Sequence, residues 1–323
     1  MTFVSLMKVE NLTTYYNTRE GYIHALESLS FDLNKGEILG LIGESGCGKS
    51  TAGFSFMNMI RKPGEIMNGS VQLGGVDILS ADSKTHRKLL WKEIAMIPQS
   101  AMNSLDPCYR VGDQIIEALT AHFPEMSWAD KLKKTKSLMA EVGLDARLIT
   151  AYPHKLSGGM KQRVVIAMAL SCDPKILISD EATTGLDVLI EAQILAILQR
   201  LKKERDLGIV IISHDLHMIT TVCDRIGVMY AGYLVEIGTT GDILENARHP
   251  YTRALFSSQI DANDFSKRVE SIDGVVPIAI SPENTCRFYS RCREKAECCS
   301  GPPADLIAVS PTHAVACHME GHQ

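Results

Sequence analysis

A glycine-rich stretch followed by Lys and Ser has the composition of a phosphate-binding loop. The segment GESGCGKS, residues 43–50, follows the apolar run EILGLIG and precedes STAGFSFMNMI, which has helical spacing. Glycines let backbone N–H groups approach a phosphate closely, and a helix N-terminus adds partial positive charge. In this pattern the Lys49 ammonium is expected to reach the β- and γ-phosphates of a nucleotide, and the Ser50 hydroxyl to bind Mg²⁺. The residues expected to contact the nucleotide here are Gly43, Glu44, Ser45, Gly46, Cys47, Gly48, Lys49, Ser50 and Thr51.

Cys47 lies inside this loop and has two interpretations. It is either a small side chain that fits the turn, or a reactive thiol. A helix N-terminus and the neighbouring Lys49 are expected to lower its pKa. The second interpretation predicts that alkylation of Cys47 blocks ATP binding.

Two adjacent carboxylates end another apolar run, ILISDE. Asp180 is expected at the end of a buried strand, where it can hold Mg²⁺ through water. Glu181 follows it, and a carboxylate one residue beyond a metal ligand is placed to polarise an attacking water. Adjacent acids at a strand end are common, so this interpretation depends on the phosphate loop.

Nine cysteines are present, and the last 38 positions hold Cys286, Cys292, Cys298, Cys299 and Cys317. In a reducing cytoplasm such clustering indicates a metal or cofactor more than disulfides.

Length and composition bound the elements that must position these groups. A chain of 323 residues suggests one large or two unequal units, and 45% hydrophobic with 22% charged residues is ordinary for a globular protein. The net charge of -5 gives no global basic field, so it does not favour nucleic-acid binding. The N-terminus lacks the pattern of a signal peptide. The apolar runs are shorter than the ~20 residues that cross a bilayer, so any membrane role is expected to act through partner chains.

The periodicity of the chain predicts an α/β fold with a mainly parallel core sheet. Residues 7–35 alternate as paired strands do, and EILGLIG, KILIS and GIVIIS are expected to form buried strands. The text becomes irregular after about residue 261, which predicts a boundary there. Helical spacing is found over residues 50–60, 112–143, 160–171, 189–206 and 242–260.

The segment LSGGMKQR, residues 156–163, lies between the two nucleotide motifs and resembles the signature loop of the ATP-binding cassette family. That loop reads LSGGQ, and Met160 replaces its Gln here. The resemblance implies that Ser157, Gly158 and Gly159 lie at a helix N-terminus and close on a γ-phosphate held by the other subunit. Backbone donors and a helix dipole suit that task.

Further cassette motifs follow in the family's order. Gln99 in MIPQS matches the Q-loop, which touches Mg²⁺ and couples to membrane subunits. Asp187 in TGLD matches the D-loop at the dimer interface, and His214 in IISHD matches the switch histidine that contacts the γ-phosphate. Tyr16 matches the aromatic residue that stacks on adenine, although the adjacent Tyr15 is an alternative. The resemblance thus implies the catalytic set Lys49, Gln99, Glu181 and His214, and the Mg²⁺ set Ser50, Gln99 and Asp180.

Two residues depart from the family pattern. Ser179 stands where the strand before the acids is usually apolar, and Ala182 stands where many relatives have Pro. Neither removes a catalytic group, so we expect a competent site.

Three stretches are similar to the dipeptide and oligopeptide permease ATPases: GESGCGKS, QSAMNSLDP and HPYTRAL. In that branch, cysteines at the spacing C-x₅-C-x₆-C-x₁₇-C bind a 4Fe-4S cluster, for which four thiolates are the ligand set. Zn²⁺ accepts the same four thiolates, but the C-x₂-C pairs usual in zinc ribbons are missing, so the resemblance favours iron and sulfur over zinc and places disulfides third. The same spacing here selects Cys286, Cys292, Cys299 and Cys317, with Cys299 in preference to Cys298.

The resemblance implies a P-loop cassette over residues 1–260, with an antiparallel β subdomain and a helical subdomain at about 100–170, and a cysteine-rich extension over 261–323. The implied role is ATP hydrolysis for a peptide importer, peripheral to the cytoplasmic face of the membrane. Expected partners are a paralogous cassette, two transmembrane permease subunits and, indirectly, a solute-binding protein, with no nucleic acid. The alternatives are a cassette ATPase acting on DNA or ribosomes, an exporter ATPase, and nickel or oligosaccharide as cargo.

Overall fold

The computed structural model describes residues 5–99, 103–258, 272–277, 279–280 and 285–320. The chain folds as two compact units, each assembled from three separate stretches. Unit 1 comprises Met1–Met7, Asp32–Ile38 and Gln72–Ile211, and unit 2 comprises Lys8–Phe31, Leu39–Val71 and Ile212–Gln323.

Unit 1 contains three neighbouring strands in the order β8 (Gly208–Ile212), β7 (Ile176–Asp180) and β6 (Ile94–Ile97). β6 and β7 are parallel, with Ile94 opposite Ile176 and Ile97 opposite Ser179. Every residue of β7 and β8 is buried, as expected for strands covered on both faces. The buried strands predicted from KILIS and GIVIIS are confirmed.

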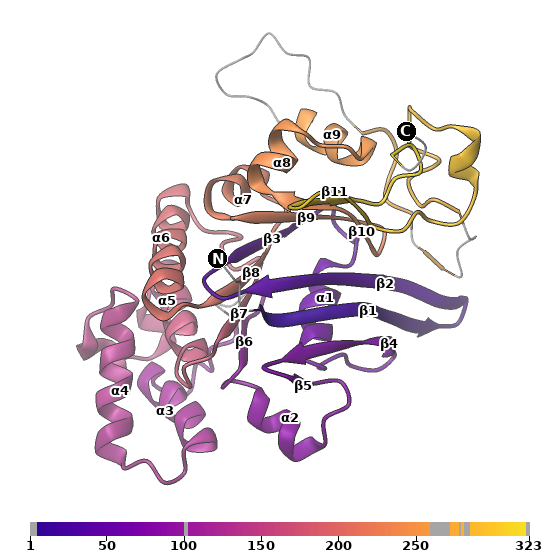
Figure 1. Cartoon of the computed structure of the whole chain (residues 1–323). Coiled ribbons are helices and arrows are strands. Elements are labelled where there is room, and N and C mark those ends of the chain that lie inside the picture. The colour runs from indigo at the N-terminus through magenta and orange to yellow at the C-terminus, as the bar shows by residue number, and fades with distance from the viewer. Residues whose placement is uncertain (1–4, 100–102, 259–271, 278, 281–284, 321–323) are drawn as a thin grey trace. The chain divides into compact units, whose positions relative to one another are not determined.

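The helices of unit 1 include a layered group (Figure 1) in which α3, α4 and α5 pack on one another and α5 contacts α6. The single helical pattern predicted over 112–143 is two helices, because Ser127 accepts a hydrogen bond from Asp130 N–H and so begins a new helix. The helices are α2 (Ser83–Leu89), α3 (Val111–His122), α4 (Trp128–Glu141), α5 (Gly158–Ala169) and α6 (Val188–Arg205), with 3₁₀ turns at Ala146–Thr150 and Pro153–Lys155.

The paired strands predicted near the N-terminus are confirmed. β1 (Ser5–Thr18) lies between β2 (Gly21–Asn34) and β4 (Gly64–Leu73), and most of these three strands belongs to unit 2. At its end β4 pairs antiparallel with β5 (Val76–Asp77) in unit 1.

Unit 2 also contains five neighbouring strands, in the order β11, β12, β10, β9, β3. β3 and β9 are parallel, whereas β9, β10, β12 and β11 pair antiparallel. All residues of β3 are buried, as the apolar run EILGLIG predicts. The bounds are β3 (Ile38–Ile42), β9 (Arg225–Tyr230), β10 (Tyr233–Thr239), β11 (Ile307–Ser310) and β12 (His313–Val315).

The helices of unit 2 are shorter than the sequence predicts. Helix α1 (Lys49–Phe56) stops four residues before the predicted end, and Asn58 just beyond it has a positive φ of 51°. In place of one helical pattern over 242–260 the structure has α8 (Thr240–Glu245) and α9 (Pro250–Ser257), because His249 caps a new helix whose first residue is Pro. Helix α7 spans Leu216–Val222, and a 3₁₀ turn spans Glu297–Ser300.

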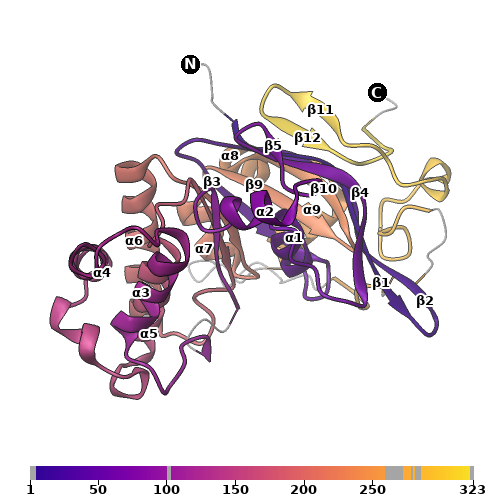
Figure 2. The same ribbon diagram turned by 90° about the horizontal axis from the view of Figure 1, so that it is seen from below.

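The C-terminal region is more regular than predicted. Strands β11 and β12 form a hairpin, which Figure 2 shows, and β12 pairs antiparallel with β10. The expectation of irregular structure after about residue 261 is therefore wrong for residues 307–315. The predicted domain boundary itself falls in 259–271, outside the described residues.

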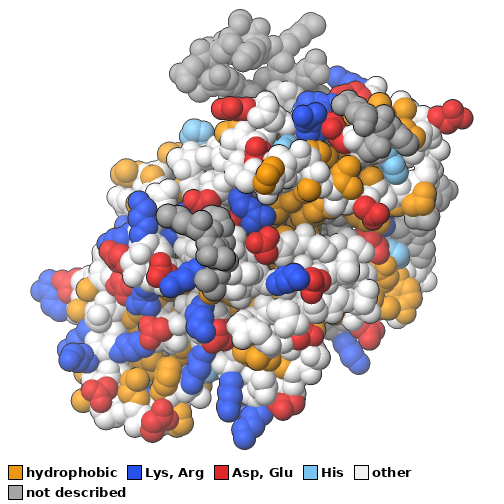
Figure 3. Space-filling view, viewed as in Figure 1, with side chains coloured by type: hydrophobic (Ala, Val, Ile, Leu, Met, Phe, Trp, Pro, Cys, Tyr) orange, Lys and Arg blue, Asp and Glu red, His pale blue; other side chains and the backbone are white. Residues whose placement is uncertain are grey.

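On the face shown in Figure 3, acidic and basic side chains are interspersed and neither sign forms a large field. This distribution accords with a net charge of -5. Within the described ranges, no helix combines the length and apolar character needed to cross a membrane.

Candidate nucleotide-binding site

The predicted site residues divide between the two units, and each set is described in its own unit. Unit 2 holds the glycine-rich loop, Tyr16 and His214. Unit 1 holds Gln99, Ser157, Gly158, Gly159, Asp180, Glu181 and Asp187.

The loop of residues 43–48 connects buried β3 to α1, which begins at Lys49. Its sharp path requires glycine at two places. Gly43 has a φ of 153°, and a Cβ added to it would lie 2.2 Å from Met229 O. Gly48 has a φ of 105°, and a Cβ added to it would lie 2.3 Å from Ala25 O. Because the first N–H groups of a helix have no partner within it, the start of α1 presents donors suited to phosphate oxygens.

The Lys49 side chain is folded over this loop. Its ammonium donates to Gly43 O at 2.7 Å and Glu44 O at 3.0 Å, and only 6% of the residue is exposed. The charge is thereby held among the backbone groups that would surround a phosphate.

Cys47 is buried, with 1% of its surface exposed. Burial raises the pKa of its thiol, and the nearby Lys49 charge lowers it by less. The prediction of a lowered pKa is therefore wrong, because the thiol faces the protein interior. The interpretation of Cys47 as a small side chain that fits the loop is the one that agrees with its position.

Glu44 has partners that the sequence did not reveal. Its N–H donates to the hydroxyl of Tyr251, on α9, at 3.0 Å. Its carboxylate accepts two hydrogen bonds from Arg291, at 2.7 and 3.0 Å. Tyr251 lies in the HPYTRAL stretch, which was noted only as a family marker, and no local signal pointed to Arg291.

The two tyrosines of β1 have different surroundings. The Tyr15 hydroxyl donates to Glu27 at 2.8 Å, and its ring stacks on His24 with centroids 3.8 Å apart. Burial and the Glu27 carboxylate raise the pKa of Tyr15. Tyr16 lies against Gly64 at the start of β4, where a Cβ would be 2.7 Å from its ring. Tyr15 is thus committed to a structural contact, which leaves Tyr16 as the candidate for adenine stacking.

His214 is an exposed residue between β8 and α7. The turn that carries it is fixed on both sides, since Ser213 N–H donates to Leu41 O at 3.2 Å and Asp215 caps α7 by accepting from Met218 N–H at 3.0 Å. The imidazole is presented from a fixed turn that follows a buried strand.

In unit 1, Gln99 and Glu181 are brought together although 82 residues separate them. They follow the adjacent parallel strands β6 and β7, whose carboxyl ends meet at one edge of the sheet. The Gln99 amide donates to the Glu181 carboxylate at 2.7 Å. Glu181 has a positive φ of 45°, which is uncommon for a residue other than glycine and is typical of functional turns.

Asp180, the last residue of β7, is 1% exposed. Its carboxylate and the Gln99 amide oxygen, both in unit 1, are oxygen donors, the ligand type that Mg²⁺ prefers. The Ser50 hydroxyl in unit 2 is a donor of the same type, so the chemistry of each residue fits the ion.

The signature loop and the D-loop each cap a helix. Ser157 accepts from Met160 N–H at the start of α5, and Asp187 accepts from Ile190 N–H at the start of α6. The two helix starts touch, because a Cβ on Gly159 would lie 2.6 Å from Ile190 Cγ2. Ser157 and Asp187 are exposed beside this contact.

The residues after Asp187 expose apolar surface. Val188 and Leu189 are 82% and 68% exposed. Adjacent apolar side chains this exposed on a helix start are typical of an interaction surface.

The C-terminal cysteines influence one another. Burial is the largest effect and raises the pKa of Cys286, Cys292 and Cys317, and the charge of a Cys299 thiolate adds to it at all three. The backbone amides of Phe288, Glu294 and Met319 lower the pKa values of the same three thiols by less than burial raises them. Cys299 is buried. The neighbouring Cys298 is less buried, and its partial burial and Cys299 both raise the pKa of its thiol. Within the described ranges, no three His, Cys, Asp or Glu side chains lie close enough to hold a metal ion.

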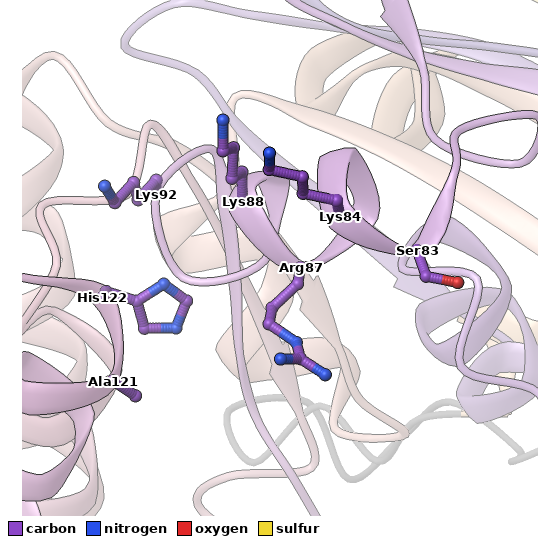
Figure 4. A pocket seen from close by; sticks show the side chains of 7 residues that line it. All are labelled: Ser83, Lys84, Arg87, Lys88, Lys92, Ala121 and His122. Atoms are coloured by element: carbon purple, nitrogen blue, oxygen red, sulfur yellow. The ribbon is translucent and has the colours of Figure 1, made fainter.

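A separate basic pocket of about 480 Å³ lies between α2 and the end of α3. As Figure 4 shows, Lys84, Arg87 and Lys88 project from α2, and His122 from α3. Burial and the nearby Lys92 charge lower the pKa of His122. No predicted site residue lines this pocket.

Comparison with known proteins accounts for nearly the whole chain. Residues 26–184 match the family model "ABC transporter", and residues 235–299 match "Oligopeptide/dipeptide transporter, C-terminal region". The dipeptide transport ATP-binding protein DppD of Haemophilus influenzae is 40% identical over 98% of this chain and 96% of its own length. Proteins of the same name from Escherichia coli and Bacillus subtilis are 37% and 38% identical, over 98% of this chain and 97% and 95% of theirs.

Solved structures show the same fold. A dimeric ATP-binding cassette in a post-hydrolysis state with ADP and Pi matches with a TM-score of 0.64 and 25% identity, over 72% of this chain and 98% of that one. The cbiO1 protein of Clostridium perfringens, part of an ABC transporter complex, matches with a TM-score of 0.65 and 28% identity, over 75% and 91%. The glycine-rich loop, the Gln99–Glu181 pair and these similarities together show that the chain belongs to the ATP-hydrolysing cassette proteins of the ABC transporter family, in the branch that carries the oligopeptide/dipeptide transporter C-terminal region.

Proposed function

We propose that this chain powers the uptake of dipeptides, oligopeptides or related solutes from the cytoplasmic face of a membrane, through two partner permease subunits served by a solute-binding protein. The observation that carries the proposal is the similarity to dipeptide transport ATP-binding proteins, which extends over 98% of the chain and includes the C-terminal region.

The hydrolytic step is assigned to residues already placed. Lys49 and His214 stabilise negative charge on the γ-phosphate, and Tyr16 stacks on the adenine. Glu181 accepts a proton from the attacking water, and the hydrogen bond from Gln99 orients its carboxylate. Ser50, Gln99 and Asp180 would hold Mg²⁺, which would neutralise charge on the phosphate oxygens.

A second cassette completes the site in this proposal. Ser157, Gly158 and Gly159 of one chain face the nucleotide bound by its neighbour, which we infer to be a paralogue. The exposed Val188 and Leu189 beside Asp187 support a contact at this place.

We also propose that Cys286, Cys292, Cys299 and Cys317 hold a 4Fe-4S cluster, with Zn²⁺ as the alternative. The proposal rests on the spacing of the four cysteines and on the contribution of Cys299 to the raised pKa values of the other three thiols. The cluster would stabilise the C-terminal segment, which is too small to form a hydrophobic core of its own.

Cys298 and Cys299 give a matched test of this ligand set. Cys299→Ser is expected to remove the cluster, because Cys299 is buried and has the spacing of the proposed ligand set, and Cys298→Ser is expected to keep it. Iron and sulfide content and absorbance near 400 nm measure the outcome in anaerobically purified protein. A colourless parent protein that contains stoichiometric zinc would show that the bound group is zinc and not a cluster. Loss of the metal only in C298S would contradict the choice of Cys299.

Transport itself is tested with the chain co-purified with its membrane subunits and reconstituted in vesicles. Uptake of a labelled dipeptide should require ATP and be lost in Glu181→Gln. Uptake of nickel or an oligosaccharide in place of peptides would change the cargo and keep the ATPase role. A chain that binds ribosomes or DNA and no membrane subunit would overturn the proposal.

A further inference from the structure

The side chain of Arg291, in the C-terminal region, reaches the phosphate loop. Its guanidinium donates to both oxygens of the Glu44 carboxylate, Nη1 to Oε2 at 2.7 Å and Nη2 to Oε1 at 3.0 Å. The side chain of Arg291 is 7% exposed and that of Glu44 is 26% exposed. Two parallel, charge-assisted bonds in a largely buried place fix both position and orientation.

The remaining donors of Arg291 fix the arginine itself. They reach the backbone carbonyls of Ile272, Asp273 and Gly274 at 2.8 to 3.3 Å and the hydroxyl of Tyr230 at 3.3 Å. The guanidinium of Arg291 is therefore held by hydrogen bonds from several sides. A guanidinium this well anchored acts as a fixed support for Glu44 rather than as a mobile surface charge.

The turn that carries Arg291 is attached to the same unit by its other residues. The ring of Phe288 packs edge-on against Tyr230 and Tyr251, with centroids 5.1 and 5.5 Å away. Arg287 lies over the ring of Tyr233, 5.1 Å from its centroid, and 3.7 Å from Glu27. Residues 286–292 are thus seated on β9, β10 and α9.

The main chain of Glu44 is fixed as well. Its N–H donates to Tyr251 and its carbonyl accepts from Lys49. The backbone of this residue therefore belongs to the glycine-rich loop, and its carboxylate places a negative charge beside the loop at which we propose that a triphosphate binds. Arg291 neutralises that charge, so the loop can accept an anion without unpaired repulsion.

From this geometry we infer that Arg291 is a positioning residue for nucleotide binding, through which the C-terminal extension sets the conformation and charge of the phosphate loop. The inference rests on the proposed use of that loop for ATP. It assigns the extension a role in the ATPase site in addition to any metal that its cysteines hold.

A double-mutant cycle in the full chain, with any bound metal retained, tests the inference. Arg291→Gln is expected to raise the Kd for MgATP about tenfold, because it leaves the Glu44 carboxylate unpaired beside the phosphates. In the Glu44→Gln background the same change should alter the Kd less than about twofold, since no charge remains to be neutralised. Arg293→Gln is the matched control, because Arg293 is exposed and contacts Asp273 at 3.3 Å.

The measurement is equilibrium binding of a fluorescent ATP analogue, with thermal unfolding run in parallel. If Arg291 had only a structural role, R291Q would lower the unfolding midpoint, and its effect on the Kd for MgATP would be the same with Glu44 or Gln at position 44. Equal Kd values for the parent and R291Q, or the same loss in both backgrounds, would overturn the inference. Failure of the parent itself to bind MgATP would instead contradict the proposed function.

Discussion

In the proposed mechanism Gln99 and Glu181 have different tasks, and the hydrogen bond between them connects the two. A carboxylate that accepts the water's proton must be held in one orientation, and the Gln99 amide holds it at 2.7 Å. Glu181→Gln keeps the shape of the site and removes its basicity. We expect this variant to bind MgATP and to hydrolyse it at least about 100-fold more slowly, as measured by phosphate release. Glu204→Gln, an exposed acid on α6, is the control, and parental turnover in E181Q would remove Glu181 from the mechanism.

Cys47 shows that position in a motif does not determine reactivity. Its place in the loop suggested a reactive thiol, whereas its burial makes the thiol less reactive. In the native chain Cys47 should be alkylated at least about tenfold more slowly than the exposed Cys108, since its thiol is buried and its pKa is raised. Mass spectrometry after brief treatment with iodoacetamide compares the two, and denatured protein gives the fully reactive reference. Rapid native labelling of Cys47 that ATP prevents would restore the idea of a reactive thiol.

At the scale of single residues, the sequence predicts what is local. Gly43 to Thr51 are contiguous, and their chemistry follows from residue type and spacing. The pairing of Gln99 with Glu181 was not predicted, because the sequence analysis assigned no strand before Gln99; it follows from β6 and β7 being adjacent and parallel, so that both end at one edge of the sheet. Glu44 and Arg291 are 247 residues apart, and neither periodicity nor a motif indicates which arginine reaches the loop.

Among the elements, the contact between the starts of α5 and α6 places the signature loop beside the D-loop. Gly159 permits it, since an added Cβ would be 2.6 Å from Ile190 Cγ2. Gly159→Ala should therefore lower the free energy of unfolding by about 1–3 kcal/mol, through forced repacking of a close contact. Chemical denaturation measures the loss.

Two further variants separate crowding from a general effect of alanine. Ile190→Ala in the G159A background should recover part of the loss, because it removes the atom that clashes. Gly241→Ala is the matched control, since a Cβ on this glycine of α8 would meet its nearest neighbour at 3.9 Å. A G159A protein as stable as the parent would show that the helices separate without cost.

Element ends show where periodicity fails. The pattern over 112–143 continues through the break, and Ser127 restarts the helix by capping it. His249 does the same before α9, although histidine is not among the usual capping residues. Caps of this kind depend on one side chain in one conformation, which hydrophobic spacing does not record.

Over the whole molecule, the C-terminal hairpin was missed because its partner strand is distant in sequence. β12 pairs with β10, which lies some 80 residues earlier in the sequence. The two short strands of the hairpin, β11 and β12, show no strong alternation of apolar and polar residues. A buried polar cluster reinforces this pairing. Glu236 of β10 is fully buried, accepts from the N–H groups of Arg248 and His249, and is bonded to His313 of β12 at 2.7 Å.

His249 makes the stability of this assembly depend on pH. Burial, with a smaller effect of Arg253, lowers its pKa from 6.5 to about 3, so it stays neutral in the folded chain. The unfolded chain binds the proton first as the pH falls below 6.5, so the stabilising effect is complete above that pH and is lost progressively towards pH 3. Between pH 7 and pH 5 this one group should remove about 2 kcal/mol of stability.

Substitution of His249 by Asn isolates that contribution. In the native chain His249 Nδ1 accepts from Tyr251 N–H at 3.0 Å, and an Asn side-chain oxygen can cap the helix in the same way without titrating. Loss of the ring's packing against Phe288 will lower stability at every pH, so the informative quantity is the slope and not the absolute value. Denaturation midpoints from pH 7 to pH 5 should fall less steeply in H249N than in the parent by the amount above, whereas exposed His217→Gln should keep the parental slope. If H249N and the parent fall in parallel, the acid sensitivity of the chain originates in other groups, and the cluster around Glu236 joins α9 to the C-terminal hairpin without making that junction responsive to protons.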